Sequence, residues 1–145
     1  MRDLNFWLLD TKKAESLPAK ERVGHYLNFY SNVLGNDNWA IHLKLDGEKV
    51  AGPHTFGWVH HYYHAQSASL EIAVEGVADR QMEVAIAHEM THLMMARLDE
   101  VIKPFIEAYL PAKVAALFHE MYVQEIEAIT VRVSEALVAL RRQEE

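Results

Sequence analysis

The chain has 145 residues, half of them hydrophobic, and its 14 Lys and Arg stand against 21 Asp and Glu, a formal net charge of −7. This composition is typical of one globular domain, and the lack of clustered basic residues excludes a phosphate-binding surface, so we expect no nucleic-acid partner. The absence of cysteine excludes disulfides, thiolate metal sites and cysteine nucleophiles, which leaves nine histidines and the carboxylates as the groups that could hold a metal.

The N-terminal residues lack the basic start and long apolar core of a secretion signal. Only Phe6–Leu9 are continuously apolar, and Asp3 and Asp10 flank them. No segment approaches the roughly 18 uninterrupted apolar residues of a membrane span, so we expect no membrane partner. We therefore expect a soluble, cytoplasmic protein with a single domain over residues 1–145.

The first half of the chain predicts one helix followed by strands. Ser16 is a candidate cap, Pro18 suits a first turn, and helically spaced apolar residues run to Gly35. Residues 39–45 then alternate as a strand does and end in the hairpin-type dipeptide Asp46-Gly47. After the break at Gly52-Pro53, two further strands are predicted over residues 56–63 and 69–74.

The second half of the chain predicts helices. Asp79 is a candidate cap for a helix that runs to about Leu98, and Pro104 and Pro111 indicate breaks. A long final helix is predicted over residues 112–141. The order of one helix, three or four strands and then helices predicts the α+β fold class.

The segment from His88 to His92 matches the pattern H-E-x-x-H inside a predicted helix. Residues four apart lie about 40° apart around a helix axis, so His88 and His92 project side by side, as two ligands of one Zn²⁺ must. Glu89 lies about 100° round the axis, beside the metal rather than on it. It could there take a proton from metal-bound water as the general base and return it as the acid.

The residues around this motif indicate a buried helix. Residues 84–96 read VAIAHEMTHLMMA, in which Glu89 is the only charged residue. A helix that is apolar on every face is buried, and a buried carboxylate and two buried imidazoles need partners, which a metal supplies directly. The alternative is a chance motif whose histidines are satisfied by hydrogen bonds within the core.

Catalytic zinc usually takes a third protein ligand. The extended motif that adds a glycine and a third histidine does not fit, because Met95 and Leu98 occupy those positions. On a helical projection of the final helix, Glu125 lies in the apolar stripe that contains Phe118 and Ile129, which predicts an inward-facing carboxylate.

The other residues of the final helix are weaker candidates. A polar stripe that ordinary solvation explains contains Lys113, Glu120, Gln124 and Glu127. Glu135 and His119 lie at the boundary between the two stripes. We therefore predict Glu125 as the third ligand, with His119 as the second choice.

The pair His88-Glu89-x-x-His92, followed by Glu125-x-x-Ala128, resembles the gluzincin branch of the zincin metallopeptidases. The order of elements over about residues 56–140 is also similar to small bacterial and phage peptidases of the ImmA/IrrE type. The resemblance implies a zincin-like fold, with a small antiparallel or mixed sheet of three to four strands packed on the motif helix. It also implies a long C-terminal helix that carries the third ligand.

This resemblance implies a Zn²⁺-dependent endopeptidase acting on a peptide or protein substrate. His88, His92 and Glu125 would be the ligands, and Glu89 the general base. Thermolysin-like members carry an Asp four residues after the glutamate ligand, where this chain has Ile129, so no residue that orients His88 is identified. In zincins a strand beside the motif helix pairs with extended substrate, and residues 56–63 or 69–74 could form it.

Several further residues have two interpretations each. Strand alternation places His60 and His64 on one face and His61 on the other, as a second metal site or as half-exposed strand residues. Tyr122 and His119 are candidates for the donor that stabilises the oxyanion, or else packing and surface residues. The rival function for the whole chain is a zincin-like metal-binding regulatory or interaction module without peptidase activity.

Overall fold

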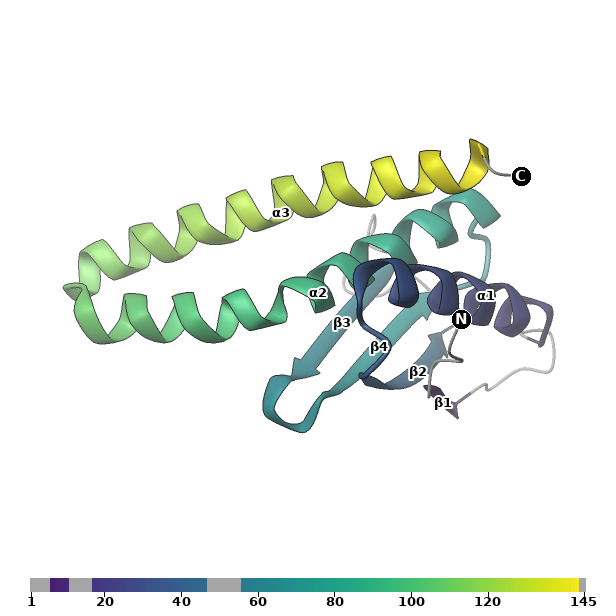
Figure 1. Cartoon of the computed structure of the whole chain (residues 1–145), viewed down its shortest axis with the longest axis horizontal. Helices are drawn as coiled ribbons and strands as arrows, with labels where there is room; N and C mark the ends of the chain where they lie inside the picture. The colour runs from purple at the N-terminus through teal and green to yellow at the C-terminus, as the bar shows by residue number, and fades with distance from the viewer. Residues whose placement is uncertain (1–5, 11–16, 47–55, 144–145) are drawn as a thin grey trace.

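The computed structural model describes residues 6–10, 17–46 and 56–143, and the fold there is α+β (Figure 1). In chain order the elements are β1 (Phe6–Asp10), α1 (Leu17–Leu34), β2 (Ala40–Asp46), β3 (Gly57–Tyr62), the short 3-10 helix η2 (Tyr63–Ala65), β4 (Ser67–Ala73), α2 (Asp79–Tyr109) and α3 (Ala112–Gln143). No helix within these described ranges is long and apolar enough to cross a membrane.

The sheet is mixed and has the strand order β1-β2-β4-β3. β2 runs parallel to both β1 and β4, whereas β3 is antiparallel to β4, with Val59 opposite Leu70. The tight connection between β3 and β4 passes through η2 and Gln66, which adopts a left-handed conformation with φ of 48°. Among the described strands, β3 pairs only with β4 and therefore forms an edge of the sheet.

The core lies between one face of the sheet and the helices α1 and α2, which cover that face (Figure 1). Alternate residues of a strand point to the same side, so the sheet contributes one row of buried side chains from each central strand. The main buried residues of the sheet are Ile41, Leu43, Leu45, Leu70 and Ile72. They belong to one cluster with Leu27 and Tyr30 of α1 and Ile86 and Met90 of α2.

Most of the elements predicted from the sequence are present. The predicted helix at residues 16–35 matches α1, which ends before Gly35 at a positive φ of 70°, and the three predicted strands match β2, β3 and β4. β1 was not predicted. The candidate cap Ser16 and the turn residues Gly47, Gly52 and Pro53 lie outside the described residues.

The predicted end of the motif helix is wrong. α2 does not end near Leu98 but continues through Pro104 to Tyr109, and the break falls at Pro111 alone. A proline inside a helix removes one backbone donor and costs roughly 3 kcal/mol, which packing can offset. Here Ile106, just after the proline, is buried and lines an apolar pocket together with Phe118 of α3.

The start of α2 also differs slightly from the prediction. Ala78 occupies the cap position, and Asp79 is the first residue of the helix. The side-chain oxygen of Gln81 accepts a hydrogen bond from the Ala78 N–H at 3.1 Å, and Asp79 accepts one from the Tyr26 hydroxyl at 2.6 Å. Asp79 therefore links α2 to α1 instead of capping its own helix.

A buried charged cluster joins the three helices at the start of α2. The Glu83 carboxylate is fully buried and accepts hydrogen bonds from the Tyr30 hydroxyl at 2.7 Å and from the Arg142 guanidinium at 2.7 and 3.0 Å. The Arg141 guanidinium also donates to Glu83 and lies over the Tyr26 ring. The C-terminal end of α3 is thereby anchored to α1 and α2.

Candidate metal centre

His88, Glu89 and His92 project from α2 toward a cavity that β3 and α3 also line. His88 and His92 are one turn apart, so their side chains are neighbours, and their Nε2 atoms lie 3.2 Å from each other. Glu89 is only 8% exposed and turns toward β3, where its carboxylate accepts a hydrogen bond from the backbone N–H of Val59. These positions agree with the division of two ligands and one neighbouring carboxylate that the motif predicts.

The carboxylate that meets the two histidines is Glu127 of α3. Its Oε1 lies 3.0 Å from His92 Nε2, and its Oε2 lies 3.5 Å from His88 Nε2. One donor atom from each of the three residues lies within 4.8 Å of the other two. α2 and α3 run side by side as a long antiparallel pair, which brings together residues that are far apart in the sequence (Figure 1).

These separations fit a tetrahedral zinc ion. With zinc–ligand bonds of about 2.0–2.1 Å, two ligand atoms of a tetrahedron are separated by about 3.3–3.4 Å. The two imidazole nitrogens are 3.2 Å apart, and each lies near a different oxygen of Glu127, at 3.0 Å for His92 and 3.5 Å for His88. The three residues would occupy one triangular face of the tetrahedron, so a fourth position would remain for water or substrate.

The prediction of Glu125 as the third ligand disagrees with this geometry. Glu125 is exposed and lines a separate apolar pocket that also contains Phe118 and Tyr122. The apolar stripe of α3 is not buried as the helical projection assumed: Phe118 lines this pocket against α2, but Phe118 and Ile129 both remain exposed. Glu127, which the sequence assigned to a solvated stripe, is the glutamate of α3 that reaches the histidines.

The face of α3 that is buried has a different pattern. It is a row at four-residue spacing, formed by Ile126, Thr130, Ser134 and Val138. Side chains at this spacing form a ridge that packs into the groove of a neighbouring helix, and Glu127 directly follows the first residue of this row. That four-residue spacing was the signal in the sequence that could have identified Glu127.

Burial is the largest influence on the pKa values of His88, Glu89 and His92. Desolvation lowers the pKa of His88 and of His92, and the charge of Glu127 acts in the opposite direction on both. Desolvation raises the pKa of the Glu89 carboxyl to about 8, and the nearby negative charge of Glu127 raises it further, against the hydrogen bond from Val59. Neutral imidazoles are the form that binds a metal, and a bound cation would oppose the effect of Glu127 on Glu89.

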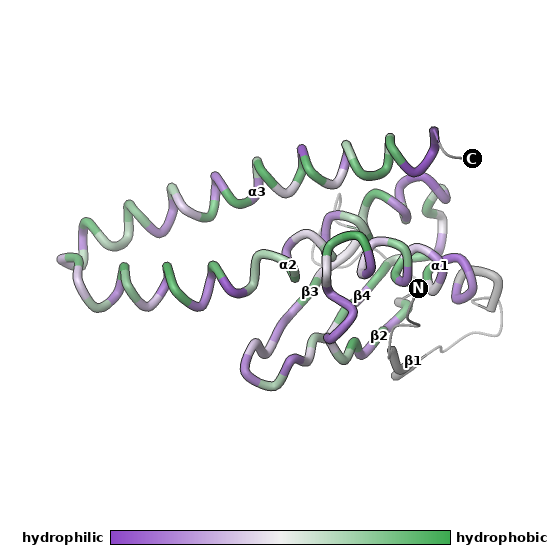
Figure 2. Tube along the Cα trace, viewed as in Figure 1, coloured by the Kyte–Doolittle hydropathy of each residue, from purple (hydrophilic) through white to green (hydrophobic). Residues whose placement is uncertain are grey.

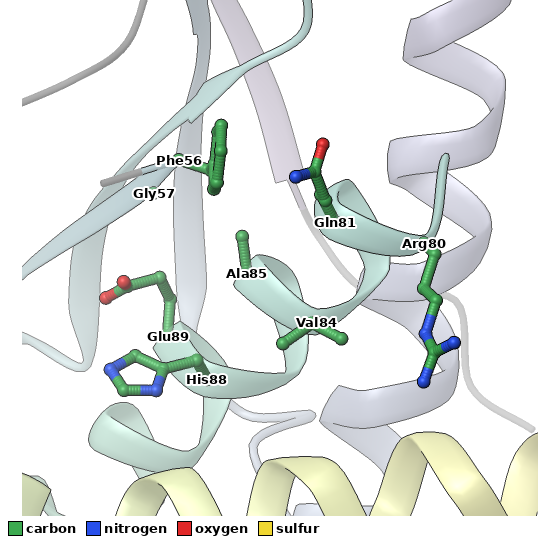
Figure 3. Close-up of a pocket in the computed structure, with 8 residues that line it drawn as sticks. All are labelled: Phe56, Gly57, Arg80, Gln81, Val84, Ala85, His88 and Glu89. Carbon is green, nitrogen blue, oxygen red and sulfur yellow. The ribbon is translucent and has the colours of Figure 1, made fainter. Parts of the chain in front are cut away.

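Two cavities meet beside Glu89. The first, of about 590 Å³, contains the three candidate ligands and is bordered by Gly57–His61 of β3 and by Asp99 and Lys103 of α2. The second, of about 400 Å³, lies on the other side of Glu89 and is mostly apolar, with Phe56, Val84 and Ala85 among its lining (Figure 3). Arg80 and Gln81 lie at the end of this second cavity, near the start of α2.

The three histidines of β3 and η2 have different surroundings. His61 borders the first cavity, with its Nε2 3.6 Å from Asp99 Oδ2, and His60 also borders this cavity but is exposed. His64 lies in η2 rather than in a strand and is also exposed, with its Nε2 3.6 Å from a carboxylate oxygen of Glu100. The structure therefore separates these histidines instead of grouping them.

The two candidate oxyanion donors do not reach the histidine pair. The Tyr122 hydroxyl donates a hydrogen bond to Asp99 Oδ1 at 2.5 Å, which also lies near Lys103, and His119 is exposed on α3. Tyr122 therefore links α3 to α2 further along the hairpin. Of the residues with two interpretations, His61 is the half-buried one that borders the cleft, and His60 borders it as an exposed residue.

Comparisons with known proteins found no matching family model, no matching curated protein and no matching solved structure.

Proposed function

We propose that this protein is a zinc-dependent peptidase with a zincin-like site, in which His88, His92 and Glu127 hold the metal and Glu89 is the general base. The observation that carries the proposal is the meeting of two imidazole nitrogens 3.2 Å apart with the Glu127 carboxylate, whose two oxygens lie 3.0 Å from His92 and 3.5 Å from His88, beside the buried carboxylate of Glu89 on the same helix. A bound zinc would supply Lewis acidity toward a water molecule and toward the scissile carbonyl.

Glu89 is suited to proton transfer at this position. A general base works best when its pKa lies near the working pH, and burial moves the pKa of this carboxyl from its usual acidic range toward about 8. The charge of a metal held by the neighbouring ligands would bring that pKa back down. The carboxylate could then accept a proton during attack on the carbonyl and donate it to the leaving amine.

The edge strand β3 supports a peptide as the substrate. Val59 directs its N–H toward Glu89, and main-chain groups of alternate strand residues point to the same side. Gly57 and His61 therefore also direct their main-chain groups away from β4 and toward the cleft. An extended peptide could pair with this edge beside the metal ligands.

The second cavity supports a preference for an apolar side chain next to the scissile bond. It opens beside Glu89 and His88, and its lining includes the apolar side chains of Phe56, Val84 and Ala85. Filling such a cavity with an aliphatic or aromatic side chain removes apolar surface from water, at about 25 cal/mol for each Å² buried. We therefore expect peptides with large apolar residues at the cleavage site to be the better substrates.

The first prediction concerns metal content and cleavage together. Purified protein should bind about one zinc ion per chain, as a single three-ligand site requires, and should cleave a mixed-sequence peptide library in a zinc-dependent manner. Glu89→Gln should retain zinc but reduce kcat/KM by at least about 10²-fold, because the base is lost while the ligands remain. Element analysis by mass spectrometry measures the metal, and peptide mass spectrometry measures cleavage.

The matched control is Glu107→Gln, which removes one exposed carboxylate from the same helix and should change neither quantity. Failure of the folded protein to bind zinc would contradict the proposed site. Zinc binding without cleavage of any peptide would instead favour the metal-binding regulatory or interaction module.

A further inference from the structure

Gly57, the first residue of β3, lies close to α2 at Ala85 and Glu89. A Cβ atom added at this position would lie 3.0 Å from Ile72 Cδ1, 3.1 Å from Glu89 Cγ and 3.5 Å from Ala85 Cβ. The first two separations are shorter than ordinary carbon–carbon contacts of about 3.5–4.0 Å. Any side chain at position 57 would therefore press on the stem of Glu89.

The need for glycine here is one of space and not of backbone conformation. Gly35 and Gly76 have φ values of 70° and 65°, and the space around their Cα atoms is open. Gly57 is the opposite case, because its φ lies outside the left-handed region and its surroundings are filled. An L-amino acid could adopt the backbone of Gly57 but could not place its Cβ without displacing a neighbour.

The same strand also holds the other end of the Glu89 side chain. Two residues after Gly57, the backbone N–H of Val59 donates a hydrogen bond to the Glu89 carboxylate. Gly57 and Glu89 border both cavities described above, so the Glu89 side chain lies between the two cavities. Figure 3 shows the Glu89 side chain extending from α2 toward the strand that carries Gly57.

We propose that Gly57 and the Val59 amide together form a seat that sets the position of the Glu89 carboxylate relative to His88, His92 and Glu127. Gly57 admits the stem of the side chain against the strand, and the Val59 N–H fixes its end. Gly57 is therefore a positioning residue for the general base, an assignment that rests on the proposed peptidase function. A misplacement of about 1 Å at a reacting group can cost about 10²-fold in rate, so the seat affects catalysis directly.

The test is Gly57→Ala in the full chain, measured with zinc bound. The added methyl group should displace the Glu89 stem by a few tenths of an ångström and weaken the hydrogen bond from Val59. We expect kcat to fall by about 10-fold or more, with KM changed less than about threefold and zinc affinity unchanged, because the ligands and the edge strand remain in place.

A second variant separates the effect on Glu89 from strain in the core. Ile72→Val removes the Cδ1 atom that the new methyl group would meet and leaves Glu89 untouched. In Gly57→Ala/Ile72→Val we expect most of the lost melting temperature to return while kcat stays low. Ile72→Val alone is the matched control and should retain kcat. Recovery of kcat in the double variant would contradict the proposal that Gly57 positions Glu89.

The Val59 amide provides a readout that does not depend on cleavage. In ¹⁵N-labelled protein, its proton resonance should move upfield and exchange faster with solvent in both variants that carry Gly57→Ala, but not in Ile72→Val. An unchanged Val59 amide would overturn the seat even if the protein cleaves no peptide. Absence of cleavage by the unmodified chain would instead count against the proposed peptidase function, so the two failures are distinguishable.

Discussion

At the scale of single residues, the site depends on which glutamate of α3 reaches the histidines. Glu125 and Glu127 are two residues apart and therefore about 160° apart around the helix. Glu127 lies 3.0 Å from His92, although its side chain remains 51% exposed, whereas Glu125 faces a different pocket. If Glu127 is the third ligand, its exposure would leave a bound metal accessible from the cleft, as the proposed catalysis requires.

The two glutamates therefore make a matched pair for mutation. Glu127→Gln should weaken zinc binding by about 10²-fold or more, because a charged ligand is replaced by a poor neutral one. Glu125→Gln removes the same charge from the same helix and should change zinc affinity by less than about twofold. Competition with a fluorescent zinc chelator measures both affinities. A larger loss for Glu125→Gln would contradict the assignment of Glu127.

At the scale of elements, α3 is tied to its neighbours on both sides of Glu127. Tyr122 donates a hydrogen bond to Asp99 of α2 on one side, and Arg141 and Arg142 bind Glu83 on the other. Two such contacts restrict both sliding and rotation of α3. The position of Glu127 relative to His88 and His92 therefore depends on polar contacts about one to four helical turns away.

The Glu83 cluster should make stability depend on pH in the acid range. Burial alone would raise the pKa of Glu83, but hydrogen bonds from Arg141, Arg142 and Tyr30 outweigh burial and hold the pKa below its ordinary value of 4.5. The ionised form is thus favoured by folding. Its contribution is complete above pH 4.5 and is lost as the pH falls through the lower pKa of the folded state.

Glu83→Gln should therefore lower the free energy of unfolding by about 3 kcal/mol at neutral pH, because it leaves two arginines without their buried partner. The difference from the unmodified protein should begin to shrink below about pH 4.5, where the unfolded chain takes up the proton, and should disappear once the pH falls below the lower pKa of Glu83 in the folded state. Urea denaturation at several pH values measures this difference in the free energy of unfolding. The control Glu71→Gln breaks a half-buried pair with Lys44 on the sheet and should cost less than about 1 kcal/mol.

At the scale of the whole molecule, the proposed site lies where the hairpin of α2 and α3 meets the sheet. α2 packs on the sheet and on α1, while α3 lies along α2 on the side away from the sheet (Figure 1). Hydrophobic and hydrophilic residues alternate along both arms of the hairpin (Figure 2). A metal held by both helices would join the outer layer to the layer that contacts the sheet.

Zinc should consequently stabilise the entire fold. A ligand that binds only the folded state at 100 times its Kd adds about 2.7 kcal/mol, which for a chain of this size raises the Tm by roughly 8 °C. Differential scanning calorimetry with and without zinc measures this shift, and His92→Ala should abolish it. A Tm that does not respond to zinc or to a chelator would contradict a site that bridges the helices.

The sequence by itself determined the parts of this protein that depend on local patterns. The periodicity of apolar residues predicted α1, α3 and three of the strands, and the spacing on α2 predicted that His88 and His92 are neighbours with the Glu89 carboxylate beside them. These features depend only on the pitch of a helix and the alternation of a strand. Pro104 shows the limit of such rules. α2 continues through this proline because tertiary packing offsets the free-energy cost of a proline inside a helix, and the sequence alone does not reveal that packing.

Only the tertiary structure decided which residues from separate elements meet. That Glu127 rather than Glu125 reaches the histidines depends on the rotation of α3 about its own axis, which follows the buried row of Ile126, Thr130, Ser134 and Val138. The role proposed for Gly57 depends on the closeness of β3 to Glu89, and His61 borders the cleft because it lies on the edge strand. Each of these features depends on a distance between segments that are remote in the sequence. The periodicity within one segment cannot predict such a distance.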